Sequence, residues 1–236
     1  MNASLLARLA EDPGRAAILL DVDGTLAPIV PAPEEASVPP ETRAELARLG
    51  RRYALVACVS GRPAADAERV VGLPELTYVG LHGLELDPGA ESHREAIHAF
   101  AETVDWPIED KGVAVSFHYR GVDDEAAARA ELERVAERAR AAGLRARFGR
   151  LVLEILPPVE AHKGTAVRRL LERAELTRAL YAGDDTTDLD AFRELERLEL
   201  GVRVAVVSDE GPPELREAAD LVVDDPAELL RVLRGL

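Results

Sequence analysis

The sequence predicts an α/β protein with a doubly wound parallel sheet and an inserted α+β segment. Three observations lead to this prediction. Short apolar runs alternate with helical patterns early in the chain, and the same alternation resumes in its last third. Such alternation is typical of a parallel sheet with helices on both faces. The middle of the chain differs, because a strand of period two precedes a long charged helix and a hairpin.

The first part of the chain contains three apolar runs that we expect to be buried strands. A helical pattern lies between each run and the next, and the second of these helices has a proline in its first turn, where proline is tolerated. The strands are expected over residues 16–20, 53–59 and 76–81, and the helices over residues 41–49 and 63–71.

The alternation resumes after residue 162 and continues to the end of the chain. We expect helices over residues 163–174, 187–195 and 214–218, strands over residues 179–182, 202–207 and 221–223, and a C-terminal helix. The two outer stretches then form one sheet. The sequence therefore predicts one unit made of residues 1–86 and 159–236, interrupted by residues 87–158.

The inserted segment is expected to be a small sheet with its own helix. Alternate residues of 113–119 are Val, Val, Phe and Tyr, so this face should pack on the helix predicted over residues 124–142. Ser116, His118 and Arg120 share the other face, which is left open. A hairpin with a turn at Gly149-Arg150 follows, and Pro157-Pro158 forms a linker to the next helix.

The composition excludes several classes of function. The chain of 236 residues has 44 acidic and 29 basic residues, a formal net charge of −15, which argues against binding nucleic acid or an anionic membrane. No apolar run is long enough to span a membrane, and the N-terminus does not resemble a secretory signal. The lone Cys58 is expected to be an inert core thiol. We expect a cytoplasmic monomer.

Two groups of carboxylates each follow a predicted buried strand. The carboxyl ends of parallel strands meet at the edge where α/β sheets bind ligands. Oxygen ligands suit Mg²⁺, which would also relieve the repulsion between neighbouring carboxylates. The alternatives are an Asp-Gly turn for the first group and a helix N-terminus for the second. The residues are Asp21 and Asp23, then Asp184, Asp185 and Asp188.

Two further features are candidates for binding a phosphate. Ser60, Gly61 and Arg62 follow the second strand, where a hydroxyl and backbone N–H groups could hold phosphate oxygens, although Ser-Gly is also an ordinary turn. Lys163 begins a predicted helix, which the helix dipole disfavours unless an anion lies nearby. The alternative is a solvated surface lysine. Lys111 is the only other lysine in the chain.

Together these motifs resemble those of the haloacid dehalogenase superfamily of phosphatases, in the order found there. They are DVDGT (residues 21–25), SGR (60–62), HKG (162–164) and GDDTTD (183–188). The resemblance implies a Rossmann-like core, an inserted α+β cap domain, Mg²⁺ and an aspartyl-phosphate intermediate.

The resemblance also assigns roles to individual residues. Asp21 would be the nucleophile, and Asp23 would be the general acid and later the general base. Ser60, Gly61, Arg62 and Lys163 would bind the phosphoryl group. Mg²⁺ would be held by Asp21, the backbone carbonyl of Asp23 and Asp184, with Asp185 or Asp188 in support.

Finer features resemble the trehalose-phosphatase family over nearly the full length. They are DVDGTLAPIVPAPEEA from residue 21, GLHGLEL (80–86), EDK (109–111), HYR (118–120), VLEILPP (152–158) and GDDTTDLDAF (183–192). The resemblance implies hydrolysis of trehalose 6-phosphate, the last step of trehalose synthesis. Leu81 departs from the pattern, since a polar residue is expected there more often.

Charged side chains in or beside the inserted segment could grip the hydroxyls of a sugar. The candidates are Glu109, Lys111, His118, Arg120, Glu154 and His82. Glu154 interrupts an apolar strand, and a buried carboxylate needs a partner. The alternative to binding a sugar is that Glu154 faces solvent or pairs with an arginine. His118 could pack or bind substrate, and His82 could bind substrate or hold a loop.

Two other functions remain open. One is hydrolysis of a related sugar phosphate, such as sucrose 6-phosphate or mannosyl-3-phosphoglycerate, because the catalytic motifs do not distinguish these substrates. The other is a non-catalytic sugar-phosphate sensor. A binding module has no need of Asp21, Asp23, Ser60, Lys163 and Asp184 together, which favours the enzyme.

Overall fold

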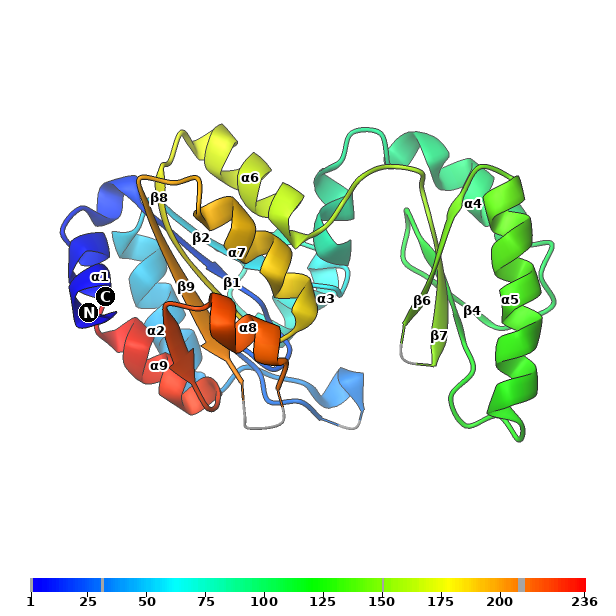
Figure 1. The fold of residues 1–236 in the computed structure, drawn as a ribbon, viewed down its shortest axis with the longest axis horizontal. Helices are drawn as coiled ribbons and strands as arrows, with labels where there is room; N and C mark the ends of the chain where they lie inside the picture. Colours follow the sequence, from blue (N-terminus) through cyan, green and yellow to red (C-terminus); the bar gives the residue numbers. More distant parts are fainter. Residues whose placement is uncertain (1, 31, 150, 208–210) are drawn as a thin grey trace. The chain divides into compact units, whose positions relative to one another are not determined.

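The structure is a computed structural model that describes residues 2–30, 32–149, 151–207 and 211–236. The chain divides into two compact units. Unit 1 comprises Met1–Leu86 and Ala161–Leu236, and unit 2 comprises Asp87–Glu160. Each unit has its own sheet, as the ribbon in Figure 1 shows. Each unit also has its own buried hydrophobic side chains.

Within its described residues, unit 1 contains one sheet of six strands, all of them parallel to their neighbours. Its strands, in order across the sheet, are β10 (Leu221–Val223), β9 (Leu200–Val206), β8 (Arg178–Gly183), β1 (Ala17–Leu20), β2 (Leu55–Val59) and β3 (Thr77–Val79). The predicted doubly wound sheet is confirmed. Because β1 lies between β2 and β8, the order reverses beside it, and such a point is where open α/β sheets bind ligands.

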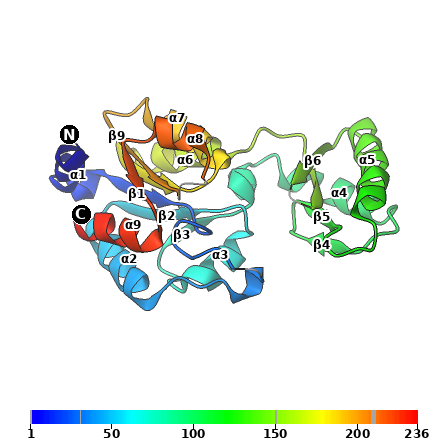
Figure 2. The same ribbon diagram turned by 60° about the horizontal axis from the view of Figure 1, so that its bottom comes forward.

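Helices cover both faces of this sheet (Figures 1 and 2). One face packs on α1 (Asn2–Ala10), α2 (Pro40–Arg52), α3 (Ala64–Val71) and α9 (Pro226–Arg234), and the other on α6 (Lys163–Ala174), α7 (Leu189–Leu195) and α8 (Pro213–Ala218). Successive residues of a strand point to opposite faces. Accordingly Ile18 and Leu20 belong to the first core, and Leu19 belongs to the second. Cys58 is completely buried in the first core, as expected.

Unit 2 contains an antiparallel sheet with two helices on one face. Its strands, in order across the sheet, are β4 (Ile108–Asp110), β5 (Val115–His118), β7 (Val152–Leu156) and β6 (Arg145–Gly149). The helices are α4 (Arg94–Ala101) and α5 (Glu125–Ala141). Val115, Phe117 and Tyr119 share a core with α5, which confirms the predicted packing. Of the predicted turn, Arg150 lies outside the described residues.

Three features differ from the sequence prediction. The strand expected over residues 76–81 ends at Val79, because Leu81 and His82 have φ values of +51° and +55°, which no strand contains. A kinked turn occupies Leu81–Leu86 instead, and His82 and Gly83 within it do not have helical φ and ψ values. The strand β4 was not predicted, because its three residues are all exposed and do not alternate between apolar and polar side chains. The helices α1 and α4 were not predicted either.

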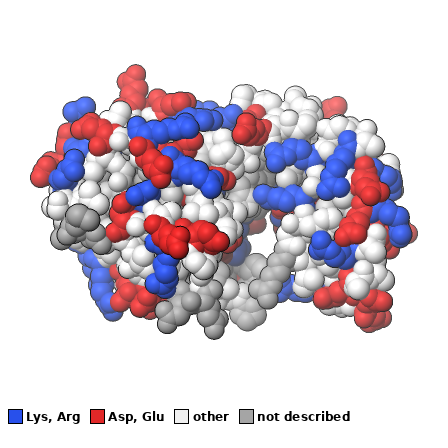
Figure 3. All heavy atoms as spheres, viewed as in Figure 1, with Lys and Arg blue, Asp and Glu red and all other residues white. Residues whose placement is uncertain are grey.

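The surface carries many charged side chains of both signs (Figure 3). On the face shown in Figure 3, acidic and basic side chains are interspersed rather than gathered in one basic patch. Among the residues that the structure describes, no helix combines the length and the apolar character that a membrane crossing requires.

Candidate active site

Asp21 lies at the carboxyl end of β1, in the middle of the sheet of unit 1. Its backbone N–H donates to the carbonyl oxygen of Ala182 on β8 at 2.9 Å, and its side chain is 7% exposed. Burial raises the pKa of the Asp21 carboxyl well above its usual value, and the charge of Lys163 opposes this shift. A carboxylate that stays ionised in such a place needs positive charge beside it.

Lys163 supplies part of that charge from the first turn of α6, which begins with a capping box between His162 and Thr165. The Nζ atom of Lys163 lies 2.9 Å from Asp21 Oδ1 and 2.7 Å from Asp188 Oδ1. Burial by itself would lower the pKa of Lys163, but the two carboxylates outweigh burial and hold that pKa above its usual value. Lys163 is only 2% exposed, so the alternative of a solvated surface lysine is wrong.

Asp188 is completely buried, and each of its carboxylate oxygens accepts two hydrogen bonds. Oδ1 accepts from Lys163 Nζ and from the Tyr181 hydroxyl, both at 2.7 Å. Oδ2 accepts from the backbone N–H groups of Asp184 and Asp185, both at 3.0 Å. A carboxylate offers about four acceptor positions in all. Asp188 therefore anchors Lys163 and the acidic loop, and it has no position left for a metal ion in this arrangement.

Tyr181 is a residue of this site that the sequence reasoning missed. It lies on β8, is completely buried, and packs edge-on against Phe192 at a centroid distance of 6.1 Å. The available signal was a hydroxyl-bearing side chain in an otherwise aliphatic strand, since a buried tyrosine hydroxyl normally has a partner. Its partner here is Asp188.

We expect the Tyr181→Phe variant to lose about tenfold or more of its kcat, because a group that orients an active-site residue typically contributes that much. The aromatic contact with Phe192 is kept, so only the bond that fixes Asp188 beside Lys163 is lost. Tyr78→Phe is the matched control, since the Tyr78 hydroxyl donates a similar bond, 2.8 Å to the Leu73 carbonyl, outside the site. Steady-state kinetics and thermal unfolding of both variants check this, and an unchanged kcat for Tyr181→Phe would contradict it.

Asp184 completes a group of three carboxylates with Asp21 and Asp188, each offering one oxygen within 4.8 Å of the others. Thr25 Oγ1 donates to Asp184 Oδ1 at 3.1 Å. At Gly24, where φ is +80°, a Cβ atom would lie 2.1 Å from Asp184 Oδ2, so only glycine leaves room for this carboxylate. Burial, together with the charge of Asp188, raises the pKa of Asp184 to about 6.

The donor set fits a hard divalent cation. Its atoms are all oxygens, and Asp21 and Asp184 lie close together with raised pKa values that added positive charge would lower. Because Asp188 is fully occupied, Asp21 and Asp184 are the side chains that could bind such an ion. Asp185 accepts from the backbone N–H and the hydroxyl of Thr186, and thus caps the short helix that precedes α7.

Asp23 is not one of these three carboxylates and forms a two-bonded ion pair with Arg62. Arg62 Nε donates to Asp23 Oδ2 at 2.6 Å, and Nη2 donates to Oδ1 at 2.7 Å. Nη1 of Arg62 donates to the carbonyl oxygen of Pro33 at 2.9 Å. The guanidinium that the sequence offered as a phosphate ligand is thus bound to the expected general acid and to a neighbouring loop.

Ser60 is held by its backbone from two sides. Its N–H donates to the Val79 carbonyl at 2.9 Å, and its own carbonyl accepts from His82 N–H at 2.8 Å. Its Oγ accepts from the Arg62 backbone N–H at 3.1 Å, which leaves the hydroxyl hydrogen to donate elsewhere. Ser60 follows β2, the strand next to β1, so it emerges at the same edge of the sheet as Asp21.

The turn of residues 80–85 lies against this loop and is strained. Leu81 and His82 both have left-handed φ values, a conformation that costs about 1–2 kcal/mol for each residue with a side chain. The chain keeps this conformation only where surrounding contacts impose it, and such strain occurs preferentially at functional sites. His82, for which the sequence left open substrate binding or holding a loop, packs against Gly61.

In unit 2, charged side chains form a row of alternating sign across the open face of the sheet. Glu109, Ser116, Glu154 and Arg147 are direct cross-strand neighbours on β4, β5, β7 and β6. The links are Arg147 Nη2 to Glu154 Oε2 at 2.5 Å, Glu154 Oε1 to Lys111 Nζ at 3.3 Å, Lys111 Nζ to Glu109 Oε2 at 3.6 Å, and Glu109 Oε2 to His118 Nε2 at 2.7 Å. We call these five linked residues the charge ladder.

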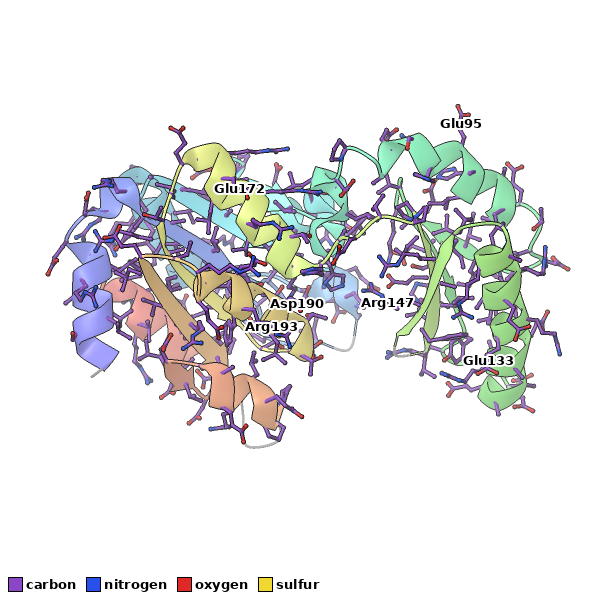
Figure 4. All side chains as sticks on the ribbon, turned by 45° about the horizontal axis from the view of Figure 1, so that its top comes forward. Glu95, Glu133, Arg147, Glu172, Asp190 and Arg193 are labelled. Atoms are coloured by element: carbon purple, nitrogen blue, oxygen red, sulfur yellow. The ribbon has the colours of Figure 1, made fainter. Side chains whose placement is uncertain are left out.

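Glu154 pairs with two cations of the charge ladder, Arg147 and Lys111, and its side chain is 14% exposed. Burial would raise its pKa, but Arg147 and then Lys111 outweigh burial and hold the Glu154 pKa below its usual value. The sequence left open whether Glu154 binds a sugar or an arginine, and the structure pairs it with Arg147. Figure 4 labels Arg147, which extends from β6 on the side of the sheet away from α5. Arg120 is exposed after β5 and is not part of the ladder.

The fold is shared with hydrolases of the haloacid dehalogenase class. A haloacid dehalogenase-like hydrolase from Bacteroides thetaiotaomicron superposes with a TM-score of 0.60 at 16% identity, covering 93% of this chain and 98% of that one. This likeness concerns the fold, and on this fold Asp21, Asp184 and the buried Lys163 lie at the carboxyl edge of the sheet.

The chain belongs to the trehalose-phosphatase family, whose model matches residues 19–107 and 103–227. A probable trehalose-phosphate phosphatase of Sinorhizobium fredii is 35% identical over 233 residues, or 90% of this chain and 84% of that protein. The solved structure of a trehalose-6-phosphate phosphatase related protein has a TM-score of 0.73 at 25% identity and covers 92% of this chain and 95% of that one. The protein is therefore a phosphatase.

Proposed function

We propose that the protein hydrolyses trehalose 6-phosphate to trehalose and phosphate through an aspartyl-phosphate intermediate, with Mg²⁺ as cofactor. The observation that carries the proposal is the buried pair of Asp21 and Lys163 at the carboxyl end of the central strand. A carboxylate nucleophile must approach an anionic phosphate, and a lysine beside it offsets their repulsion. Unit 1 is the proposed catalytic core, and unit 2 is the proposed cap domain.

The first step transfers the phosphoryl group to Asp21. A carboxylate oxygen of Asp21 forms a bond to phosphorus while the bond from phosphorus to the sugar oxygen breaks. Asp23 donates a proton to the leaving sugar oxygen. Lys163 and the hydroxyl hydrogen of Ser60 stabilise the phosphoryl oxygens. For this step Asp23 must turn from the position in which both its oxygens bind Arg62.

The second step releases phosphate from Asp21. Asp23, now ionised, removes a proton from a water molecule whose oxygen attacks phosphorus, and the bond from phosphorus to Asp21 breaks. When bound, Mg²⁺ supplies positive charge that stabilises the phosphoryl oxygens. The carboxylates of Asp21 and Asp184, with the backbone carbonyl of Asp23, would hold the ion.

We propose that the charge ladder on unit 2 binds the sugar. Arg147 and Lys111 balance Glu109 and Glu154, so the ladder has no net charge when His118 is neutral. Rigid donors and acceptors of both kinds suit the hydroxyls of a neutral disaccharide. A leaving group that carries a carboxylate would find no net positive charge on the ladder to pair with, because both cations are already bound to glutamates. The ladder therefore favours trehalose 6-phosphate over mannosyl-3-phosphoglycerate.

The deciding experiment is phosphate release from a panel of trehalose, sucrose and glucose 6-phosphates and mannosyl-3-phosphoglycerate. We expect the highest kcat/KM with trehalose 6-phosphate, loss of activity with EDTA, and recovery with added Mg²⁺. A higher kcat/KM with another sugar phosphate would mean that trehalose 6-phosphate is not the substrate, while the proposed mechanism would still apply. Binding of sugar phosphates without any phosphate release would instead show a sensor.

We expect Glu154→Ala to lower kcat/KM for trehalose 6-phosphate at least about tenfold, since Arg147 and Lys111 are left without their shared acceptor. Turnover of p-nitrophenyl phosphate, which has no sugar, should change little. Glu133→Ala is the control, because Glu133 lies on α5 and pairs with Arg129 away from the ladder. Equal losses of kcat/KM on both substrates would show that the charge ladder does not recognise the sugar.

A further inference from the structure

We propose that the turn of residues 80–85 is a positioning device for the phosphate-binding loop Ser60–Arg62, with His82 as the residue that contacts the loop. The proposal rests on the proposed function, because it takes Ser60–Arg62 to be the loop that binds the phosphoryl group. In it His82 acts through Gly61 and does not touch the substrate.

Backbone hydrogen bonds join the turn to the loop. His82 N–H donates to the Ser60 carbonyl at 2.8 Å, and Leu81 N–H donates to the Arg62 carbonyl at 2.9 Å. Both donors belong to the two residues with left-handed φ values. In a continued strand, neighbouring N–H groups would point in opposite directions. The strained conformation is thus what lets consecutive N–H groups reach carbonyls on the same loop.

Glu85 fastens the same turn at its other end. Its Oε2 accepts from the Gly80 N–H, and its Oε1 accepts from the Ala64 N–H at the start of α3, both at 3.0 Å. One carboxylate therefore ties the beginning of the turn to the helix that follows the phosphate-binding loop. With these bonds, the loop is held where it leaves β2 and where it enters α3.

The contact between His82 and Gly61 is too close for any larger residue. A Cβ atom placed on Gly61 would lie 2.8 Å from His82 Nε2 and 2.9 Å from Cε1. The ring therefore rests directly on the backbone of the loop.

The turn is also confined on its other side, by α6. A Cβ atom on Gly83 would lie 2.9 Å from Ala166 Cβ and 3.0 Å from the His162 carbonyl oxygen. The turn is thus wedged between the loop that carries Ser60 and the first turn of α6, which carries Lys163. The turn therefore helps to set the spacing between Ser60 and Lys163, the two groups proposed to bind the phosphoryl oxygens.

A double-mutant cycle tests this wedge, because two residues in direct contact should not act independently. The variants are Gly61→Ala, His82→Ala and the double variant, and the probe is inorganic phosphate. Its dissociation constant is measured by calorimetry, and its inhibition constant is measured with p-nitrophenyl phosphate as substrate. We expect Gly61→Ala to weaken phosphate binding about tenfold or more, since small displacements at an active site have effects of this size.

His82→Ala removes the ring that the new methyl group would strike. We therefore expect the double variant to bind phosphate several-fold more tightly than Gly61→Ala alone. Losses that simply multiply would overturn the proposal. Gly14→Ala is the matched control and should bind phosphate normally, because nothing lies within 4 Å of its Cβ position.

Two further variants keep the result interpretable. If Gly61→Ala does not fold, Glu85→Gln takes its place, since its amide would face an N–H donor. We expect weaker phosphate binding at an unchanged unfolding temperature, and unchanged binding would overturn the proposal. Ser60→Ala separates the two hypotheses. If Ser60→Ala leaves phosphate affinity unchanged, the hypothesis that Ser60–Arg62 binds phosphate is wrong. If Ser60→Ala is the only variant that weakens binding, the loop does bind phosphate, and the hypothesis that the turn of residues 80–85 positions it is wrong.

Discussion

Asp21→Asn should reduce turnover of every phosphate ester by about 10³-fold or more, because an amide cannot form the acyl phosphate and such nucleophiles account for losses of this size. The fold should survive. Asparagine has nearly the same shape as aspartate, Lys163 keeps Asp188 as its partner at 2.7 Å, and one of the three close carboxylates loses its charge. The measurement is phosphate release under single-turnover conditions, with circular dichroism to verify the fold.

A covalent readout supports the kinetic one. Wild-type protein denatured during turnover should carry an added phosphoryl group on the peptide that contains Asp21, detectable by mass spectrometry. Asp66→Asn is the matched control, because Asp66 is a half-exposed carboxylate on α3 whose ion pair is with Arg69, at 3.8 Å. Retained activity in Asp21→Asn, or a phosphoryl group on another residue, would contradict the assignment of the nucleophile.

Lys163→Met should abolish most activity and also destabilise the protein by about 3–5 kcal/mol, the usual result of removing one partner from a buried ion pair. Methionine fills a similar volume, so the loss is electrostatic. Asp21 and Asp188 would face each other without the cation that lies 2.9 and 2.7 Å from them. Urea unfolding of wild type and variant measures the difference in the free energy of unfolding.

The other lysine of the chain provides the control. Lys111→Met removes a cation from the charge ladder of unit 2, where Arg147 still pairs with Glu154. We expect this variant to keep its turnover of p-nitrophenyl phosphate and to lose much less stability than Lys163→Met. If the two lysine variants had equal unfolding free energies, Lys163 would not be the buried counter-ion described above.

Much of the candidate site could be predicted because parallel strands bring their carboxyl ends together. Asp21, Ser60 and Asp184 each follow a strand that its apolar run identifies, and β1 does lie between β2 and β8. Lys163 could be included because a lysine at a helix N-terminus is unfavourable without an anion. Local patterns were sufficient for these residues.

The partners of side chains could not be predicted in the same way. Nothing local in the sequence indicates that Arg62 binds Asp23, which is 39 residues away, or that Tyr181 donates to Asp188. The turn after β3 was hidden for another reason. Its residues continue the apolar pattern of the strand, while their left-handed φ values are imposed by tertiary contacts. The choice for Glu154 likewise depended on cross-strand register with Arg147.

The burial of Cys58 has a practical consequence for spectroscopy. This thiol is the only one in the chain, it is completely buried, and burial raises its pKa to about 12. Alkylating reagents attack thiolates, so Cys58 should stay unmodified in the native protein. A cysteine introduced at an exposed position such as Glu133 would therefore be the sole site of maleimide coupling. Fluorophores or nitroxide spin labels can thus be attached to either unit without first replacing a native residue.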